Sequence, residues 1–220
     1  MRPGQPFIRL DWLVDNADQL ARRVGEQLYI TLIAIVAGFI ISFGLALLVR
    51  RYPRLGGPIL GVAGTLYAIP SIAAFVLLIP ITHLTLWTAE IVLTSYTLVM
   101  LVRNMIAGFR AVPADVLEAA DGMGYTNVQR LWRVELPIAT PIIIAGVRIA
   151  TVTTMGLVTI AALIGSGGLG YVIVNLGILR QFPTATIAGA ALVVLLSALI
   201  DWGLAVVQRR LTPWSRALEA

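Results

Sequence analysis

The sequence contains no lysine and no cysteine, and His83 is its only histidine. A phosphate-binding P-loop requires a lysine that reaches the nucleotide phosphates, so the chain has no ATPase site of that type. Without thiols there is no disulfide, no cysteine nucleophile and no thiolate metal ligand. A single histidine cannot build a polyhistidine metal site. We therefore expect no enzymatic activity, no metal and no cofactor on this chain.

Charged side chains are scarce, at 12% of the 220 residues, whereas 59% of residues are hydrophobic and the mean hydropathy is +0.91. Soluble domains carry about 25% charged residues. The apolar surplus exceeds what a small core could bury, which predicts an integral membrane protein in contact with the lipid bilayer. The net charge of +5 comes from arginines near the ends of apolar runs. They form no basic stripe interleaved with aromatics, so we expect no nucleic-acid binding.

Apolar runs long enough to cross the roughly 30 Å hydrocarbon core as helices divide the chain. They cover residues 28–49, 59–81, 85–106, about 138–164 and about 185–207. A sixth crossing through 166–183 is a weaker alternative to a re-entrant segment or a loop, because it would contain several glycines, Arg180 and Pro183. We expect an all-α membrane protein with about five transmembrane helices.

An odd number of spans places the two ends of the chain on opposite sides of the membrane. The turn after the first run, the polar loop 107–137 and the tail 208–220 then share one side, and they hold most of the arginines. The positive-inside rule makes that side cytoplasmic. Residues 1–27 are then an amphipathic extracytoplasmic segment, and residues 28–207 are the transmembrane domain.

Proline and polar side chains inside the runs are candidates for a translocation path. Pro70 predicts a kink beside Tyr67 and Ser71, and such a kink fits a path or ordinary packing equally well. Thr154 could line the same path, although membrane threonines more often bond to a carbonyl of their own helix. The sequence leaves both alternatives open.

Charged side chains well inside the runs need a partner or access to water. Asp201 is a candidate partner for Arg148, and we favour a structural ion pair over a transport role. Glu90 lies near the outer end of the third run, where contact with water is the favoured interpretation. Small residues recur at every fourth position of the first run, a pattern that lets another helix approach closely: Ala34, Gly38, Ser42 and Ala46.

The loop 113–137 predicts two short helices separated by a glycine turn. Gly122 and Gly124 end or bend the first helix. Thr126 and Gln129 have the spacing of a capping box for the second. Pro137 is expected to break the chain after it and to favour an extended backbone at the preceding leucine. Rigid helices in a loop between spans favour a surface for a partner protein over a loop that merely packs on the membrane face.

The same loop resembles the EAA motif of ABC-importer permeases, which is Glu-Ala-Ala, three residues, Gly, nine residues, Ile, one residue and Leu-Pro. Every spacing fits, and the one departure is valine in place of isoleucine. The matching residues are Glu118, Ala119, Ala120, Gly124, Val134, Leu136 and Pro137.

This resemblance implies the small type I ABC importer permease fold, with a cytoplasmic coupling helix that docks on a separate ATP-binding subunit. ATP and Mg²⁺ would be bound by that subunit. Glu118 would accept hydrogen bonds from basic groups of the partner, and the small side chains of Ala119 and Ala120 would allow close insertion. The resemblance also implies a second permease copy or a related permease, and the bacterial inner (plasma) membrane as location.

Within this family the chain is most similar to permeases of glycine betaine, carnitine and choline uptake. The segments that carry this similarity are 69–73, 78–82, 134–137, 145–152 and 161–170. Some relatives carry a fused substrate-binding domain, for which this chain leaves no room, so a separate extracytoplasmic binding protein is expected. Importers of amino acids such as methionine, and less readily a secondary transporter, are the alternatives. Five spans do not divide into the equal inverted repeats of many secondary transporters.

Overall fold

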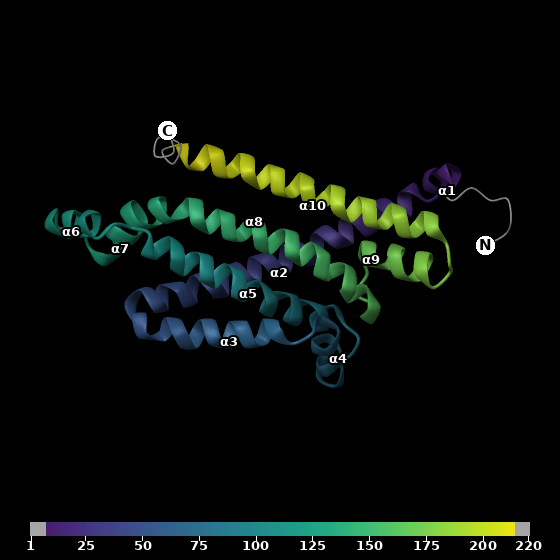
Figure 1. Ribbon diagram of the computed structural model, residues 1–220, viewed down its shortest axis with the longest axis horizontal. Helices are drawn as coiled ribbons and strands as arrows, with labels where there is room; N and C mark the ends of the chain where they lie inside the picture. Colours follow the sequence, from purple (N-terminus) through teal and green to yellow (C-terminus); the bar gives the residue numbers. More distant parts are fainter. Residues whose placement is uncertain (1–7, 214–220) are drawn as a thin grey trace.

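The computed structural model describes residues 8–213 as helices joined by short turns (Figure 1). Residues 1–7 of the expected extracytoplasmic segment and 214–220 of the expected tail lie outside the described residues. The helices are α1 (Leu10–Asp15), α2 (Ala17–Arg51), α3 (Gly56–Ala68), α4 (Ser71–Thr82), α5 (Leu86–Arg110), α6 (Ala114–Gly122), α7 (Asn127–Arg130), α8 (Leu136–Ala161), α9 (Leu169–Tyr171) and α10 (Pro183–Leu211). Turns of 3₁₀ helix cover Pro53–Leu55 and Ala162–Ile164, and π turns cover Leu131–Glu135 and Val172–Ile178.

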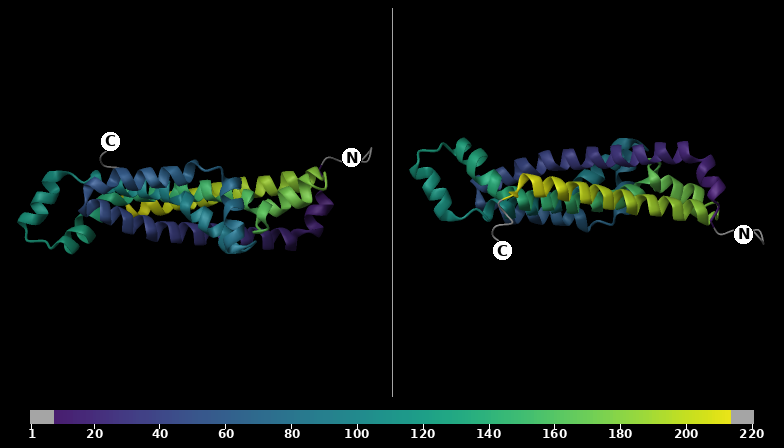
Figure 2. Two further views of the ribbon diagram at one scale, coloured as in Figure 1. Left: turned by 90° about the horizontal axis from the view of Figure 1, so that it is seen from below. Right: turned by 90° about the horizontal axis from the view of Figure 1, so that it is seen from above.

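The long helices run side by side, and α5 has the most extensive contacts, with α2 and with α8 (Figures 1 and 2). The small-residue stripe of α2 is buried, with Ala34 and Ser42 at 0% and Ala46 at 1% exposure. A Cβ on Gly38 would overlap the hydroxyl group of Thr97 on α5. The predicted close approach of a helix to this stripe is therefore confirmed, and α5 is that helix.

The first membrane helix begins earlier than the apolar run predicts. Instead of starting near residue 28, α2 starts at Ala17 and continues for 35 residues, about 52 Å at the α-helical rise. Its outer part is held by α8 and α9. The fully buried Gln27 donates to the Met155 carbonyl oxygen at 2.8 Å and accepts from the Leu169 N–H at 3.1 Å. These contacts fix the outer part of α2, which is longer than a membrane crossing requires, to the rest of the bundle.

The second run is not one straight crossing. At Ile69 and Pro70 the chain bends by 92°, so that α4 leaves the direction of α3 (Figure 1). Ile69 is extended, at φ −66° and ψ 129°, as expected for a residue before proline. The expected kink is thus a sharp break. Pro80, in contrast, lies inside α4 without ending it.

The segment after the fourth span forms a short apolar helical stretch, Leu169–Ile178. Its ten residues reach about 15 Å, too short for a crossing. The weaker alternative of a sixth span is therefore wrong. Among the described residues four helices are long and apolar enough to span a membrane, or five when α3 and α4 count as one broken span.

The two ends of the helix bundle differ in what they carry. The turn between α2 and α3, the α6–α7 loop and the C-terminal end of α10 lie at one end, and α1, α4 and α9 lie at the other (Figure 1). The first end includes Arg50, Arg51, Arg130 and Arg209. This arrangement matches the orientation expected from the positive-inside rule, with the first end in the cytoplasm.

Candidate functional site

The loop between α5 and α8 projects beyond the cytoplasmic ends of the long helices (Figure 2). Its first helix, α6, ends in two backbone bonds, from Gly124 N–H to the Asp121 carbonyl and from Tyr125 N–H to the Ala120 carbonyl. Together they form a Schellman motif, which requires a left-handed residue after the helix. Gly124 provides it at φ 79°, a conformation that costs other residues strain.

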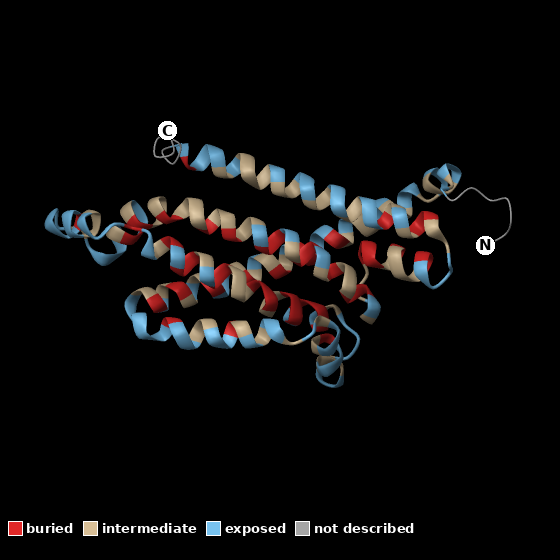
Figure 3. Ribbon diagram, in the orientation of Figure 1, coloured by how far each residue is buried: buried red, intermediate tan, exposed pale blue. Residues whose placement is uncertain are grey.

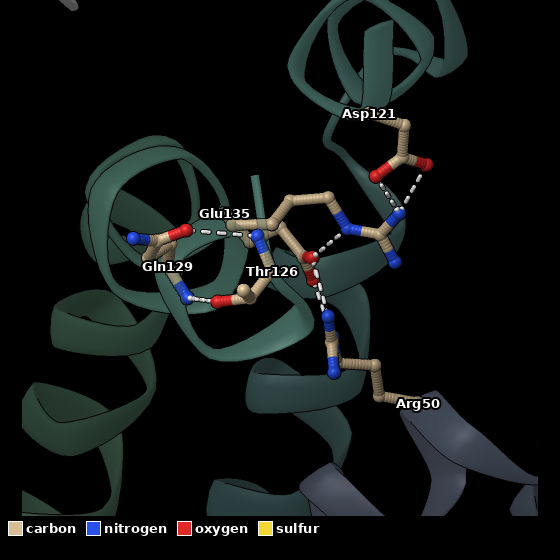
Figure 4. Close-up of polar contacts among 6 residues, drawn as sticks. Arg50, Asp121, Thr126, Gln129 and Glu135 are labelled. Carbon is tan, nitrogen blue, oxygen red and sulfur yellow. Dashed lines mark hydrogen bonds and ion pairs between the residues drawn. The ribbon is translucent and has the colours of Figure 1, made fainter. Parts of the chain in front are cut away.

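The second helix, α7, begins with the predicted capping box. Gln129 N–H donates to Thr126 Oγ1 at 3.3 Å, and Thr126 N–H donates to Gln129 Oε1 at 2.9 Å (Figure 4). Two of the backbone N–H donors at the helix start are therefore satisfied within the turn. The two-helix prediction is confirmed up to this point, and the loop has a defined shape without a partner.

Beyond α7, the expected break at Pro137 is wrong. Leu136 is helical, at φ −61° and ψ −47°, and α7 continues through the π turn Leu131–Glu135 into α8. In a π turn the backbone bonds shift by one residue, so one carbonyl loses its usual donor. A proline just after the turn therefore costs the helix little stability, although it has no N–H to donate. The second helix of the loop, α7, is therefore continuous with the fourth span through the π turn.

The residues of the motif consequently divide into two groups. Glu118 and Ala119 are exposed on α6, while Val134, Leu136 and Pro137 are partly buried at the root of α8. Ala120 is only 1% exposed, so its small side chain packs within this chain and not against a partner. Only Ala119 is thus exposed beside Glu118, and the expectation that the two alanines allow close insertion of a partner stays a prediction.

Met123 is a surface residue that sequence analysis missed. It follows α6 directly and is 66% exposed, next to Gly124 at the tip of the loop. Most of α6 is likewise exposed (Figure 3). Within the described part of the chain, Glu118 makes no ion pair. The tip thus presents an unpaired carboxylate and an apolar side chain on a rigid helix.

Four charged side chains behind the tip form a continuous network (Figure 4). Glu135 accepts from Arg50 Nε at 2.5 Å and Arg50 Nη2 at 2.6 Å, and also from Arg130 Nε at 3.0 Å. Arg130 Nη1 donates to both Asp121 oxygens, at 2.7 and 2.5 Å. We call these residues the cytoplasmic charge network. Sequence analysis missed it, because Arg50 and Glu135 are 85 positions apart.

Electrostatics keep Glu135 ionised in this setting. Glu135 is 4% exposed and precedes the apolar residues of α8. Burial acts to raise its pKa, but hydrogen bonds and charges from Arg50 and Arg130 outweigh burial and hold the pKa below the usual range of a glutamate. The carboxylate therefore stays charged and keeps both arginines bound.

The candidate translocation residues belong to two parts of the fold, the break between α3 and α4 and the interior of α8. Tyr67, Pro70 and Ser71 flank the break between α3 and α4, where the Tyr67 ring lies 5.4 Å from the ring of Tyr96. The Tyr96 hydroxyl donates to the Ile69 carbonyl and so holds the break. Thr154 is 2% exposed in the interior of α8. The proposed path stays a prediction.

The remaining charged residues inside the membrane helices differ in their surroundings. Arg148 donates from Nε and Nη2 to the two carboxylate oxygens of Asp201, at 2.9 and 2.8 Å, and from Nη1 to Gln208 at 3.2 Å. These contacts join α8 to α10. Glu90 is 4% exposed, so the expectation that it reaches water is wrong.

A family model for binding-protein-dependent transport system inner membrane components matches residues 28–213. The chain belongs to this family. It is therefore the permease of a binding-protein-dependent ABC importer and not its ATPase, and it resides in the inner membrane. Membership places the α6–α7 loop in a transporter that also requires a binding protein and an ATP-hydrolysing partner.

Curated relatives cover nearly the whole permease. The glycine betaine/carnitine/choline transport system permease protein OpuCB of Bacillus subtilis is 35% identical over 205 residues, covering 93% of this chain and 94% of the relative. The osmoprotectant import permease protein OsmW of Salmonella typhimurium is 38% identical over 209 residues, covering 93% and 97%.

Solved structures share the permease's architecture. An inward-facing structure of the MetNI methionine ABC transporter has a TM-score of 0.79 at 25% identity and covers 88% of this chain and 96% of that chain. An amino acid ABC transporter solved with histidines has a TM-score of 0.73 at 16% identity, covering 92% and 99%, which supports the fold alone. The expected all-α type I permease fold is thereby confirmed.

Proposed function

We propose that this permease imports quaternary ammonium osmoprotectants such as glycine betaine, choline or carnitine. The observation that carries the proposal is sequence similarity over the whole chain. Relatives named for glycine betaine, carnitine, choline or osmoprotectants are 32–38% identical over at least 90% of this chain. The methionine transporter shares the fold at 25% identity, which makes amino acids the second candidate.

Uptake in a strain that lacks other importers tests the substrate. We expect cells that carry the permease with its ATPase and binding protein to accumulate labelled glycine betaine or choline, and deletion of the permease to abolish that accumulation. Labelled methionine is the control, and its uptake should be unaffected by the deletion. Unchanged glycine betaine and choline uptake on deletion, or loss of methionine uptake instead, would reverse the assignment.

We further propose that α6 is the coupling helix that docks on the ATP-binding subunit. Its exposed Glu118 lacks an ion-pair partner within the described residues, and Ala119 leaves space beside it for close approach. A basic group on the ATPase would form a charge-assisted hydrogen bond with Glu118. Met123 adds an exposed apolar contact at the tip. ATP-driven movement of the ATPase would displace α6 and the spans attached to it.

On this proposal the assembly also contains a second permease, which is either another copy of this chain or a related permease. Two docking loops then meet two ATP-binding subunits. The binding protein would deliver substrate at the opposite end of the bundle, where α1, α4 and α9 lie (Figure 1).

Charge reversal at Glu118 tests the docking proposal. We expect Glu118→Arg to abolish co-purification of the ATPase and coupled uptake, because the arginine would repel the basic group that the glutamate attracts. Membrane insertion should be unchanged, since Glu118 is exposed in the isolated chain. The matched control is Asp18→Arg, the same charge reversal at an exposed position near the outer end, which should leave ATPase co-purification intact. Normal assembly of Glu118→Arg would argue against docking through α6.

A further inference from the structure

The position of α6 raises the question of how its movement reaches the membrane helices. This helix projects beyond the bundle and is connected to it by short turns (Figure 2). A cavity of about 220 Å³ separates α6 from the bundle and is bordered by Leu117 of α6 and by Ala46 and Ile106 of the spans. Packed apolar side chains therefore do not fill the space between the docking helix and α2.

The cytoplasmic charge network crosses this gap. Asp121 lies on α6 and Arg130 on α7, while Glu135 ends the π turn before α8 and Arg50 lies in the last turn of α2. Arg50, Arg130 and Glu135 themselves border the cavity. The network thus links the docking helix to the first and fourth spans through the exposed Asp121 and through three side chains that are partly or fully buried.

The geometry of the contacts suits the transmission of movement. Arg50 holds Glu135 through two nitrogens, and Arg130 holds Asp121 through two oxygens. The Arg50–Glu135 contact pairs two guanidinium nitrogens with two carboxylate oxygens, a fork that combines charge with a fixed planar orientation and so resists sliding and rotation. Arg130 binds Asp121 through the single nitrogen Nη1, which supplies charge without that fork. Glu135 is the central member, because it binds both arginines while its own side chain is only 5% exposed.

We propose that Glu135 is a positioning residue that couples the displacement of α6 to α2 and α8. The proposal rests on the proposed function of α6 as the docking helix. Without the carboxylate, Arg50 and Arg130 lose their common partner and α2 is released from the loop. Glu118 remains free to dock. The ATPase then binds and hydrolyses ATP, but its movement no longer changes the spans.

The test uses the complete transporter, with ATPase and binding protein, reconstituted in liposomes. Glu135→Gln keeps the size of the side chain and removes its charge. We expect ATPase co-purification and ATP hydrolysis to stay within about twofold of wild type, and substrate uptake per ATP to fall about tenfold, within the range of couplings between distant sites. An unchanged ratio of uptake to hydrolysis would overturn the proposal.

A second pair of variants covers the case in which Glu135→Gln fails to assemble. Arg50→Gln removes only the link to α2 and leaves the contacts among Glu135, Arg130 and Asp121 intact. Its matched control is Arg51→Gln, the same change one residue later, where the side chain contacts Tyr52 outside the network. We expect Arg50→Gln to lower uptake per ATP and Arg51→Gln to leave it unchanged; equal ratios in both would overturn the proposal.

The test of Glu135 and the proposed function can fail independently of each other. Uptake is measured with whichever of glycine betaine, choline and methionine the wild-type transporter takes up, so a wrong substrate leaves the test intact. If Glu118→Arg still assembles, docking through α6 fails independently of Glu135. If Glu118→Arg loses assembly while both Glu135→Gln and Arg50→Gln keep normal coupling, docking stands and the network proposal fails.

Discussion

At the scale of single residues, Glu90 is the carboxylate with the least support from its surroundings. Both of its oxygens are buried without a hydrogen-bond partner in the described part of the chain. It borders a groove of about 320 Å³ between α2 and α5, together with apolar side chains such as Ile33 and Leu98. Burying a polar group without a partner costs free energy that an apolar side chain of similar size avoids.

We therefore expect Glu90→Met to raise the free energy of unfolding of the isolated permease by about 1–3 kcal/mol. Thermal unfolding in detergent measures this change. The control is Glu26→Met, because Glu26 accepts the Gly168 N–H at 2.8 Å and an Arg23 nitrogen at 2.7 Å, so its loss should be destabilising. Destabilisation by Glu90→Met would show that the carboxylate has a partner in solution.

At the scale of elements, the packing of α2 on α5 depends on one missing side chain. Gly38 lies where a Cβ would overlap Thr97, whereas Gly44 on the same helix has no atom within 4 Å of an added Cβ. Small residues allow membrane helices to approach until their backbones nearly touch. The close contact between α2 and α5 is thus set by the absence of a methyl group at Gly38.

Alanine substitutions at Gly38 and Gly44 distinguish the effect of helix packing on stability from the effect of helix propensity. We expect Gly38→Ala to destabilise the permease by about 1–3 kcal/mol, because the added methyl group forces the helices apart. Gly44→Ala should be neutral or stabilising by up to about 1 kcal/mol, because alanine favours the helix. Thermal midpoints in detergent provide the comparison, and equal effects of the two changes would contradict the packing account.

At the scale of the whole molecule, the orientation in the membrane decides which end meets the ATPase. The chain contains no cysteine, so a single introduced cysteine is a unique label site. We expect a membrane-impermeant maleimide to label Leu84→Cys from outside, because Leu84 is 67% exposed between α4 and α5. Arg54→Cys, in the turn between α2 and α3, should react only after the membrane is permeabilised. The reverse pattern would overturn the orientation.

Local signals in the sequence determined much of this protein. Apolar runs predicted the membrane class and most of the spans, because a helix of a given length in lipid needs a matching run of apolar residues. The capping box at Thr126 and the helix end at Gly124 depend on neighbours a few positions away. The spacing from Glu118 to Pro137 indicated the permease family, which the family model confirms, and docking of this loop on the ATPase stays a prediction.

Other features depended on which helix faces meet, and only the tertiary structure decided them. The contact between Arg50 and Glu135 joins residues far apart in the chain, and no local pattern selects that pair. The burial of Ala120 and Glu90, and the direction of α4 after Pro70, follow from neighbouring elements. Lipid favours any apolar surface equally, so the bilayer specifies that helices span it, while side-chain packing and ion pairs specify how they are arranged.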